Sequence, residues 1–432
     1  MRKPPGSPPP EVRADLSRRR VGGDFVDLVT QRRKYRLITP LFGGGVEPGT
    51  ADPVTTVRGP EVRGQLRFWW RACKGGGFNG DLGQMKEMED EIWGAASTPR
   101  RPLPSKVQVQ VEIDSEGRDE QPFQITTRKG KQVVVPSSGW TELSYVAFPL
   151  RPELNRGVVT KPPGSVRSNV CFTLTITFPK QYQEHVEAAL WAWETFGGIG
   201  ARTRRGFGAL QLMSVDGMGR ELPEGSRVED SIRSGLRKHV ATGAWPTGVP
   251  HLSHNVRLKL VGPFSDPWNA WEYLIQKLRE FRQSRYPGSA PSRPGRSQWP
   301  EPDTIRNLTG MSSSKHARPL SPVRKFPRGQ FGLPIVFHFK DPGDPRGTRL
   351  EGEEYERLAS PLILRPLACR EGAIGLALIL EGTGVDVMPG GLVLKHDSRE
   401  YRVAATLTPA EAKSIPPLGG KTDVLEAFLG TL

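Results

Sequence analysis

The chain has 432 residues, a length that corresponds to roughly two to four domains of about 100–200 residues each. Its 61 lysines and arginines exceed its 46 acidic residues, which gives a net charge of +15 and indicates a polyanionic partner. Hydrophobic residues make up 36% of the chain, which excludes wholesale disorder, and the longest clean apolar run, residues 373–380, is too short for a membrane span.

The first 30 residues are rich in proline and contain a run of three arginines at residues 18–20. They lack the apolar segment of a signal peptide, so we expect a flexible basic tail over residues 1–30. The cysteines, Cys73, Cys171 and Cys369, lie too far apart in sequence for a disulfide framework or a CxxC pair. These features are typical of a cytoplasmic protein without a membrane partner or a cofactor.

Residues 31–215 are expected to form the first domain, because apolar residues recur there with the periods of strands and helices. The predicted elements are a strand at 34–39, a helix at 63–74, strands at 107–113 and 172–178, a helix at 186–196 and a strand at 209–215. The order strand–helix–strand–strand–helix–strand is that of the ferredoxin-like fold. An insertion of about residues 114–168 contains a predicted hairpin at 123–135, which turns at 128–131.

Residues 216–250 are rich in glycine, proline and charge, and we expect a linker there. Residues 251–432 are expected to form a second ferredoxin-like domain, less complete than the first because no final strand can be placed. Its predicted elements are strands at 256–260, 333–340 and 373–380, helices at 271–281 and 423–429, and a polar loop at 287–303. The predicted fold is therefore α+β, with two tandem ferredoxin-like (βαββαβ) domains and long insertions.

The predicted helix at 63–74 carries a basic ridge beside its apolar face. Four cations at helical spacing have no acidic residue among them, and Trp70 falls on the border between the ridge and the core face. Such an arrangement suits RNA, because guanidinium groups pair with phosphates while an aromatic ring stacks on a base. An amphipathic helix with a solvated face is the alternative. The candidate RNA contacts are Arg58, Arg63, Arg67, Trp70, Arg71 and Lys74.

The segment FGGIGARTRRGFG (residues 196–208) interleaves glycines with arginines after the second predicted helix. Glycine permits positive φ angles and close approach, so that backbone N–H groups can cradle a phosphate while arginines supply charge. A tight helix–strand connection would explain the glycines but not the three arginines. The candidate phosphate contacts are Gly197, Gly198, Gly200, Arg202, Arg204 and Arg205, and Arg296 and Arg306 are further candidates in the second domain.

The sequence offers little support for a metal site or for catalysis. His251 and His254 form a close pair, but no cysteine or further histidine completes a zinc set, so no metal site is expected. No histidine precedes His185, which excludes a histidine general base in the first half of the first domain and counts against a metal-independent endoribonuclease. This enzyme class remains the alternative hypothesis. A DNA-binding or ribosome-associated basic protein is a third, which charge alone does not exclude.

Several of these segments resemble those of the RAMP proteins of CRISPR systems. Three segments resemble the RAMP proteins in general: TPLFGGG (39–45), RGQLRFWWR (63–71) and GGIGARTRRGFG (197–208). RSQWPEPDTIR (296–306) and RGQFGLPIVFHF (328–339) narrow the resemblance to the first-named RAMP subunit of type III-B, or Cmr, effector complexes.

The resemblance implies two ferredoxin-like domains related to the RNA-recognition motif, within a multi-subunit ribonucleoprotein. It also implies that the subunit is not catalytic, holds the 3′-distal part of the guide RNA (crRNA), contacts other RAMP subunits and helps to admit target RNA. In this interpretation Arg63, Arg67 and Arg71 hold phosphates, Trp70 stacks on a base, and the glycine-rich loop embraces the RNA backbone.

Overall fold

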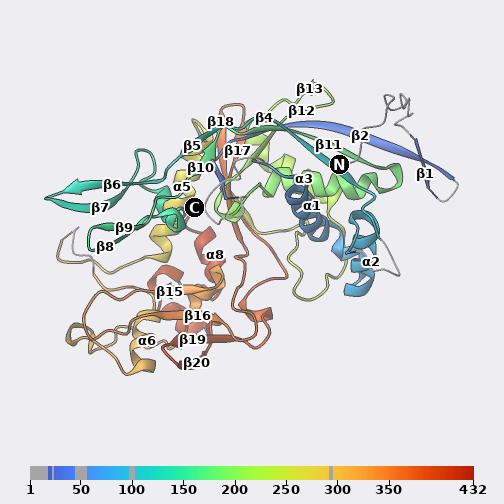
Figure 1. The fold of residues 1–432 in the computed structure, drawn as a ribbon. Coiled ribbons are helices and arrows are strands. Elements are labelled where there is room, and N and C mark those ends of the chain that lie inside the picture. The colour runs from blue at the N-terminus through green and yellow to red at the C-terminus, as the bar shows by residue number, and fades with distance from the viewer. Residues whose placement is uncertain (1–17, 22–23, 44–55, 97–102, 291–294) are drawn as a thin grey trace, which may run out of the picture.

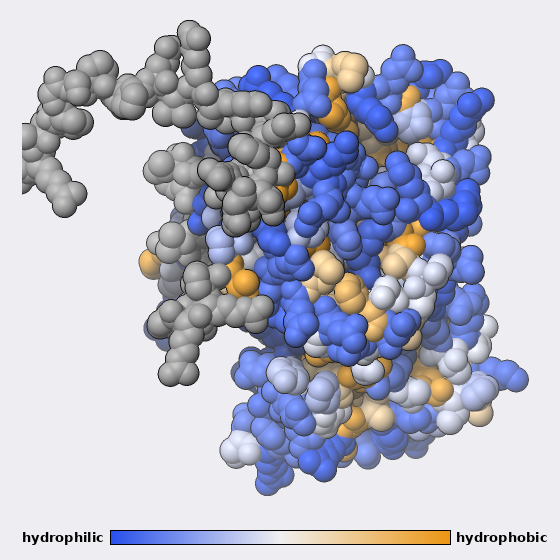
Figure 2. Space-filling model, turned by 90° about the vertical axis from the view of Figure 1, so that its right-hand side faces the viewer, coloured by the Kyte–Doolittle hydropathy of each residue, from blue (hydrophilic) through white to orange (hydrophobic). Residues whose placement is uncertain are grey.

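The computed structural model describes residues 18–21, 24–43, 56–96, 103–290 and 295–432. It shows a mixed α+β protein, in which several antiparallel sheets are accompanied by helices (Figure 1). Within these ranges no helix has the length and apolar character that crossing a membrane requires. The face drawn in Figure 2 is mainly hydrophilic, and its hydrophobic residues form small groups between polar ones.

The largest sheet has six strands, and all belong to the first half of the chain. They are β1 (Arg18–Val21), β2 (Asp24–Leu37), β4 (Gln108–Ser115), β11 (Cys171–Pro179), β12 (Leu210–Val215) and β13 (Met218–Gly219). Their order is β13–β12–β2–β11–β4, and β1 pairs with β2. Phe172, Leu174 and Ile176 of β11 are fully buried, as their alternation with threonines predicts. The predicted strands of this half are therefore present, in the predicted chain order.

Two helices, α1 (Gly59–Lys74) and α3 (Gln183–Phe196), pack on this sheet. α2 (Leu82–Trp93) packs against α1, and α4 (Val228–His239) packs against α3. α1 and α3 pack against each other on the same side of the sheet (Figure 1). α4 lies inside the segment for which a linker was expected, because Val228, Ile232 and Leu236 recur at helical spacing and bury one face of the segment.

The expected N-terminal tail also differs in part from the structure. Residues 1–17 and 22–23 lie outside the described residues, so the structure tests the expectation only after them. β1 and β2 form an antiparallel hairpin, so regular structure begins well before residue 30.

The insertion between β4 and β11 contains the predicted hairpin and a second, unpredicted one. The first consists of β6 (Phe123–Arg128) and β7 (Lys131–Pro136), the second of β8 (Glu153–Asn155) and β9 (Val158–Lys161). Both project from the same side of the molecule (Figure 1). At the base of the insertion, β3 (Leu41–Phe42), β10 (Val166–Ser168) and β5 (Arg118–Glu120) form a three-stranded sheet.

The second half of the chain departs from a complete βαββαβ unit. A three-stranded sheet of order β14–β18–β17 packs against α5, and a separate four-stranded sheet of order β15–β16–β19–β20 lies at the opposite end of the molecule from the large sheet (Figure 1). The strands are β14 (Leu258–Phe264), β15 (Ile335–Phe337), β16 (Thr348–Gly352), β17 (Leu362–Cys369), β18 (Gly372–Ile379), β19 (Leu392–His396) and β20 (Arg399–Val403). The helices are α5 (Pro267–Arg282), α6 (Glu301–Thr309), α7 (Pro409–Lys413) and α8 (Val424–Leu429).

Candidate nucleic-acid interface

The basic ridge of α1 is partly neutralised by a second helix. Arg67 donates from Nε to Oε1 of Glu89 at 2.7 Å, and Arg71 donates from Nη1 to the same oxygen at 2.5 Å. Glu89 belongs to α2 and is only 2% exposed, so two arginines are needed to satisfy its carboxylate. Arg67 and Arg71 therefore form ion pairs within the protein in this structure, and their role as phosphate contacts stays a prediction.

Trp70 is a core residue. Its side chain has no exposed area, and its indole Nε1 donates to Nδ1 of His185 on α3 at 3.0 Å. Phe78 and the His185 ring lie about 6 Å from the indole ring. A buried ring with these neighbours offers no face to a base, so the predicted stacking role of Trp70 is wrong for this conformation. The border between the basic ridge and the apolar face of α1, where Trp70 lies, is therefore covered by α3.

Two other cations of the ridge, Arg63 and Lys74, form no ion pair with a carboxylate among the described residues. Arg58 precedes the helix, where its charge helps to lower the pKa of Glu61 against the effect of burial. All three are half-buried. Nε of Arg63 is buried and has no hydrogen-bond partner in the described part of the chain. These three cations of the predicted ridge remain candidates for RNA contact.

The glycine-rich loop is shaped by packing. Gly206 has a φ angle of +86°, and a Cβ atom there would lie 2.4 Å from Nε1 of Trp271. Gly208 has a φ angle of +61°, and a Cβ atom there would lie 1.9 Å from the carbonyl oxygen of Ile199. Glycine is therefore required at both positions by conformation and by close approach.

Gly197 and Gly198 likewise face the protein interior. A Cβ atom on Gly197 would lie 2.5 Å from Nε1 of Trp69, and the carbonyl oxygen of Gly198 accepts a hydrogen bond from Nε1 of Trp193 at 2.9 Å. These contacts tie the start of the loop to α1 and α3.

Backbone N–H groups of the loop, predicted to cradle a phosphate, are engaged within the protein. Gly200 N–H donates to Oε1 of Glu61 at 2.6 Å, and Ala201 N–H donates to the carbonyl oxygen of Phe42 at 2.8 Å. Gly208 N–H donates to the Pro40 carbonyl oxygen, also at 2.8 Å. The predicted phosphate cradle at Gly197, Gly198 and Gly200 is therefore corrected to a packed turn, in which the Glu61 carboxylate already occupies an anion position.

The three arginines of the loop differ from those of α1, because none has a carboxylate partner among the described residues. Arg202, Arg204 and Arg205 donate from Nη1 to main-chain carbonyl oxygens of Val146, Ser360 and Leu362. Burial lowers the pKa of Arg204 to about 10. Burial, together with the nearby Arg282, lowers the pKa of Arg205 to about 9. The loop thus concentrates positive charge that the described protein does not compensate.

Aromatic rings accompany this charge. The guanidinium of Arg202 lies 4.6 Å from the centre of the Phe148 ring, which is 59% exposed. Arg282 lies over the Phe331 ring at 5.2 Å, and its Nε is buried without a hydrogen-bond partner in the described residues. We call Arg202, Arg204, Arg205, Arg282 and Phe148 the loop patch. Phe148 and Arg282 were not predictable from sequence, because only the fold brings the insertion and the end of α5 to the loop.

Arg296 and Arg306 belong to an internal ion-pair network. Arg306 binds both carboxylate oxygens of Asp344, at 3.0 and 2.9 Å, and shares Asp303 with Arg296. Although burial opposes ionisation, hydrogen bonds from Arg306 and from the Ser313 N–H lower the pKa of Asp344 to about 2. Both arginines are therefore corrected from RNA contacts to partners of buried carboxylates.

The same region contains a cluster of potential metal ligands. His316, Asp341 and Asp344 place ligand atoms within 4.8 Å of one another. Arg306 already binds both oxygens of Asp344, however, and Nδ1 of His316 lies 3.1 Å from that carboxylate. The cluster thus forms part of the ion-pair network.

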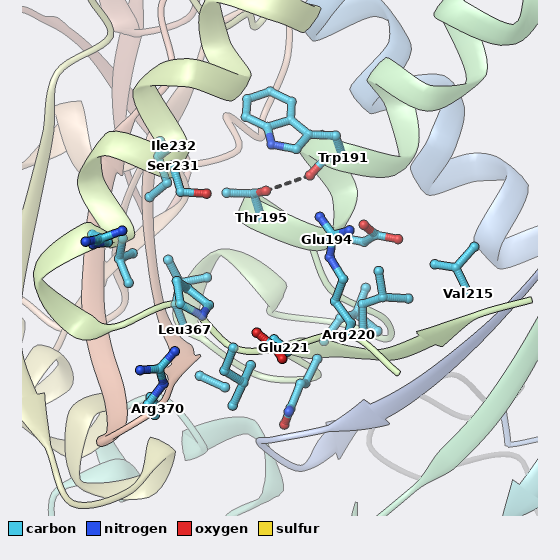
Figure 3. Close-up of a pocket in the computed structure, with 18 of the residues that line it drawn as sticks. Trp191, Glu194, Thr195, Val215, Arg220, Glu221, Ser231, Ile232, Leu367 and Arg370 are labelled. Carbon is cyan, nitrogen blue, oxygen red and sulfur yellow. Dashed lines mark hydrogen bonds between the residues drawn. The ribbon is translucent and has the colours of Figure 1, made fainter. Parts of the chain in front are cut away.

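A cavity of about 950 Å³ lies between α3, α4 and β12 (Figure 3). Its charges are largely paired. Arg33 lies 2.9 Å from Glu194, and Arg227 and Arg370 both pair with Glu224. A cavity with balanced charge does not favour a polyanion, so the loop patch is the better candidate for RNA.

Part of the chain is similar to proteins of a known family. Residues 34–211 match the family model of the RAMP superfamily. The curated protein "CRISPR system Cmr subunit Cmr1-2" of Pyrococcus furiosus is 28% identical over 186 residues, which are 41% of this chain and 92% of that protein. Cmr1-1 of the same organism is 24% identical over 241 residues, 52% of this chain and 64% of that protein.

Solved structures of low identity are also similar. The apo crystal structure of Cmr1 from Pyrococcus furiosus is 16% identical, with 82% of this chain and 88% of that chain covered and a TM-score of 0.42. A chain in the type III-B Cmr-beta complex bound to cognate target RNA is 12% identical, with 93% and 99% covered and a TM-score of 0.48.

Proposed function

We propose that this chain is a non-catalytic RNA-binding subunit of a type III-B CRISPR effector ribonucleoprotein in the cytoplasm, because residues 34–211 match the family model of the RAMP superfamily and a Cmr1 protein is similar in sequence. In this role it holds the 3′-distal part of the guide RNA, contacts other RAMP subunits and helps target RNA to engage. The proposal includes two ferredoxin-like domains. The order β12–β2–β11–β4 supports the first, and β14, α5, β18 and β17 form the core of a reduced second.

The observation that carries the proposal is the uncompensated charge of the loop patch. Three loop arginines use part of their donors on main-chain carbonyl oxygens, and none meets a carboxylate among the described residues. Because no carboxylate neutralises these guanidinium groups among the described residues, an RNA phosphate would not have to displace an internal ion-pair partner here, as it would at Arg67 or Arg71.

The experiment that tests this role is isolation of the full chain, tagged, from its host. We expect guide RNA and other RAMP subunits to co-purify with it. Recovery of ribosomal components in their place would contradict the proposal.

The non-catalytic part of the proposal needs a second measurement. Incubated with a labelled guide precursor, with and without Mg²⁺, the purified chain should bind the RNA and leave it intact. Cleavage that disappears when one residue of this chain is substituted would support the endoribonuclease alternative instead.

A further inference from the structure

A second cavity, of about 300 Å³, lies where the insertion meets α5. One wall is the segment from Leu37 to Pro40, which follows β2. A second wall comes from the insertion, with Ser138 and Gly139, and a third is the side chain of Trp268 in the first turn of α5. The volume is at the lower end of the range that small-ligand pockets occupy.

The polar lining of this cavity is open toward anionic and neutral groups. Glu120 contributes the only carboxylate of the lining, and both of its oxygens are bonded, Oε1 to Trp140 Nε1 at 2.7 Å and Oε2 to the Ser168 hydroxyl at 2.5 Å. Arg118 and Asn169 are exposed and form no side-chain hydrogen bond with the described residues. The lining therefore offers a guanidinium and an amide to a ligand, while its carboxylate is already satisfied.

The aromatic wall is rigid and has no stacking partner. The Trp268 ring meets Trp140 at 5.1 Å with an angle of 89°, and Trp271 at 5.5 Å with an angle of 85°. Both neighbours pack at nearly right angles, so they fix the orientation of the ring without stacking on it. A half-buried indole in such a cavity suits another flat ring.

The cavity adjoins the glycine-rich loop. The Thr39 hydroxyl donates to the carbonyl oxygen of Gly206 at 2.6 Å, and Gly208 N–H donates to that of Pro40. On the α5 side, Trp271 Nε1 donates to the carbonyl oxygen of Arg205 at 2.7 Å. The walls of the cavity are therefore bonded directly to the segment that carries the loop arginines.

We propose that this cavity receives one unpaired base of a single-stranded RNA. The base stacks on Trp268, Arg118 faces an adjacent phosphate, and Ser138 and Asn169 offer hydrogen bonds to the base edge. Stacking of this kind accepts every base, because each has a π-face, so the stacking contact selects unpaired RNA over duplex. The inference rests on the proposed RNA-binding function and adds a base subsite to it.

The test compares single-stranded RNA affinity of the full chain and three variants. Ser138→Phe fills the cavity mouth from an exposed position, Trp268→Leu removes the stacking wall, and Arg118→Gln removes the charge. Tyr355→Leu and Arg399→Gln, both at exposed positions in the second half of the chain, are the matched controls. We expect the first two variants to weaken binding about 10-fold, as loss of one base–aromatic stack does, and the controls to bind like wild type.

A second readout removes the ambiguity of a destabilised variant. A 2-aminopurine placed at successive positions of the RNA should be quenched at one register by the wild-type chain, and this quenching should vanish in Ser138→Phe while its melting temperature is unchanged. If wild type fails to bind RNA, the proposed function itself fails. If wild type binds RNA while Ser138→Phe and Trp268→Leu keep full affinity and quenching, the base subsite alone is overturned.

Discussion

A single buried carboxylate, Glu89, decides what the basic face of α1 can do. In the sequence of α1, four cations recur at helical spacing without an acidic residue among them. That pattern predicts a ridge that is either solvated or bound to RNA. In the fold, α2 brings Glu89 to Arg67 and Arg71 and converts half of the ridge into an internal ion-pair group. The periodicity of α1 cannot predict an ion-pair partner on α2, so the pairing with Glu89 could be found only in the structure.

The ridge gives the first prediction. Arg63→Gln should flatten the slope of log K against log salt for single-stranded RNA by about 0.7, the value for one lost phosphate contact. The double substitution Arg67→Gln and Arg71→Gln should leave this slope unchanged and lower the melting temperature, because it leaves Glu89 buried without a partner. Salt titrations and thermal melts of both variants decide between the roles. A flattened slope in the double variant would restore the ridge as an RNA contact.

Glu61 gives a prediction about pH. Burial raises the pKa of its carboxyl group, although the Gly200 N–H bond acts in the opposite direction. The folded chain therefore binds this proton more tightly than the unfolded chain, so stability falls as pH rises from about 4.5 through the raised value. Glu61→Gln keeps an acceptor for Gly200 and removes the charge. Its melting temperature, relative to wild type, should increase from pH 5 to pH 8, and parallel curves would contradict this account.

At the scale of elements, strands and helices with strong alternation were predictable and charge-rich ones were not. β11 and α3 match their apolar patterns closely, because the apolar residues of each element all face the same buried layer. The sequence of α4 reads as polar and glycine-rich, yet three apolar residues suffice to bury it. In β16, β19 and β20 the alternation of apolar and polar residues is weak, because charged residues interrupt it. Of the four strands in their sheet, only β15 was predicted.

The β6–β7 hairpin gives a prediction at this scale. Its tip carries Arg128 and Lys131 in exposed positions, beyond the body of the molecule (Figure 1). In an assembled complex, converting both to Gln should weaken target RNA binding by about threefold to tenfold without changing the melting temperature, because the lost contacts are to phosphates. Arg156→Gln at the tip of the neighbouring β8–β9 hairpin is the matched control. Native target binding by the double variant would show that the tip does not contact RNA.

At the scale of the whole molecule, the glycine-rich loop connects the two halves of the chain. Arg204 and Arg205 donate to carbonyl oxygens in and just before β17. In the opposite direction the fully buried Arg365 of β17 donates to the carbonyl oxygens of Gly197 and Leu210. The loop motif was recognisable in sequence as a glycine–arginine segment. Its role as the junction was not, because these hydrogen bonds to and from β17 join residues more than 150 positions apart along the chain.

The central claim is that the loop arginines hold RNA phosphates, and one salt titration tests it most directly. The triple variant Arg202→Gln, Arg204→Gln, Arg205→Gln is compared with wild type and with a control triple at the exposed Arg346, Arg357 and Arg399. A thermal melt confirms that each folds, and Arg202→Gln alone serves if the triple does not. We predict that the loop variant loses about 10-fold or more in RNA affinity at moderate salt and that its log K–log salt slope flattens by up to about 2. Native affinity and slope in a folded loop variant would contradict the claim.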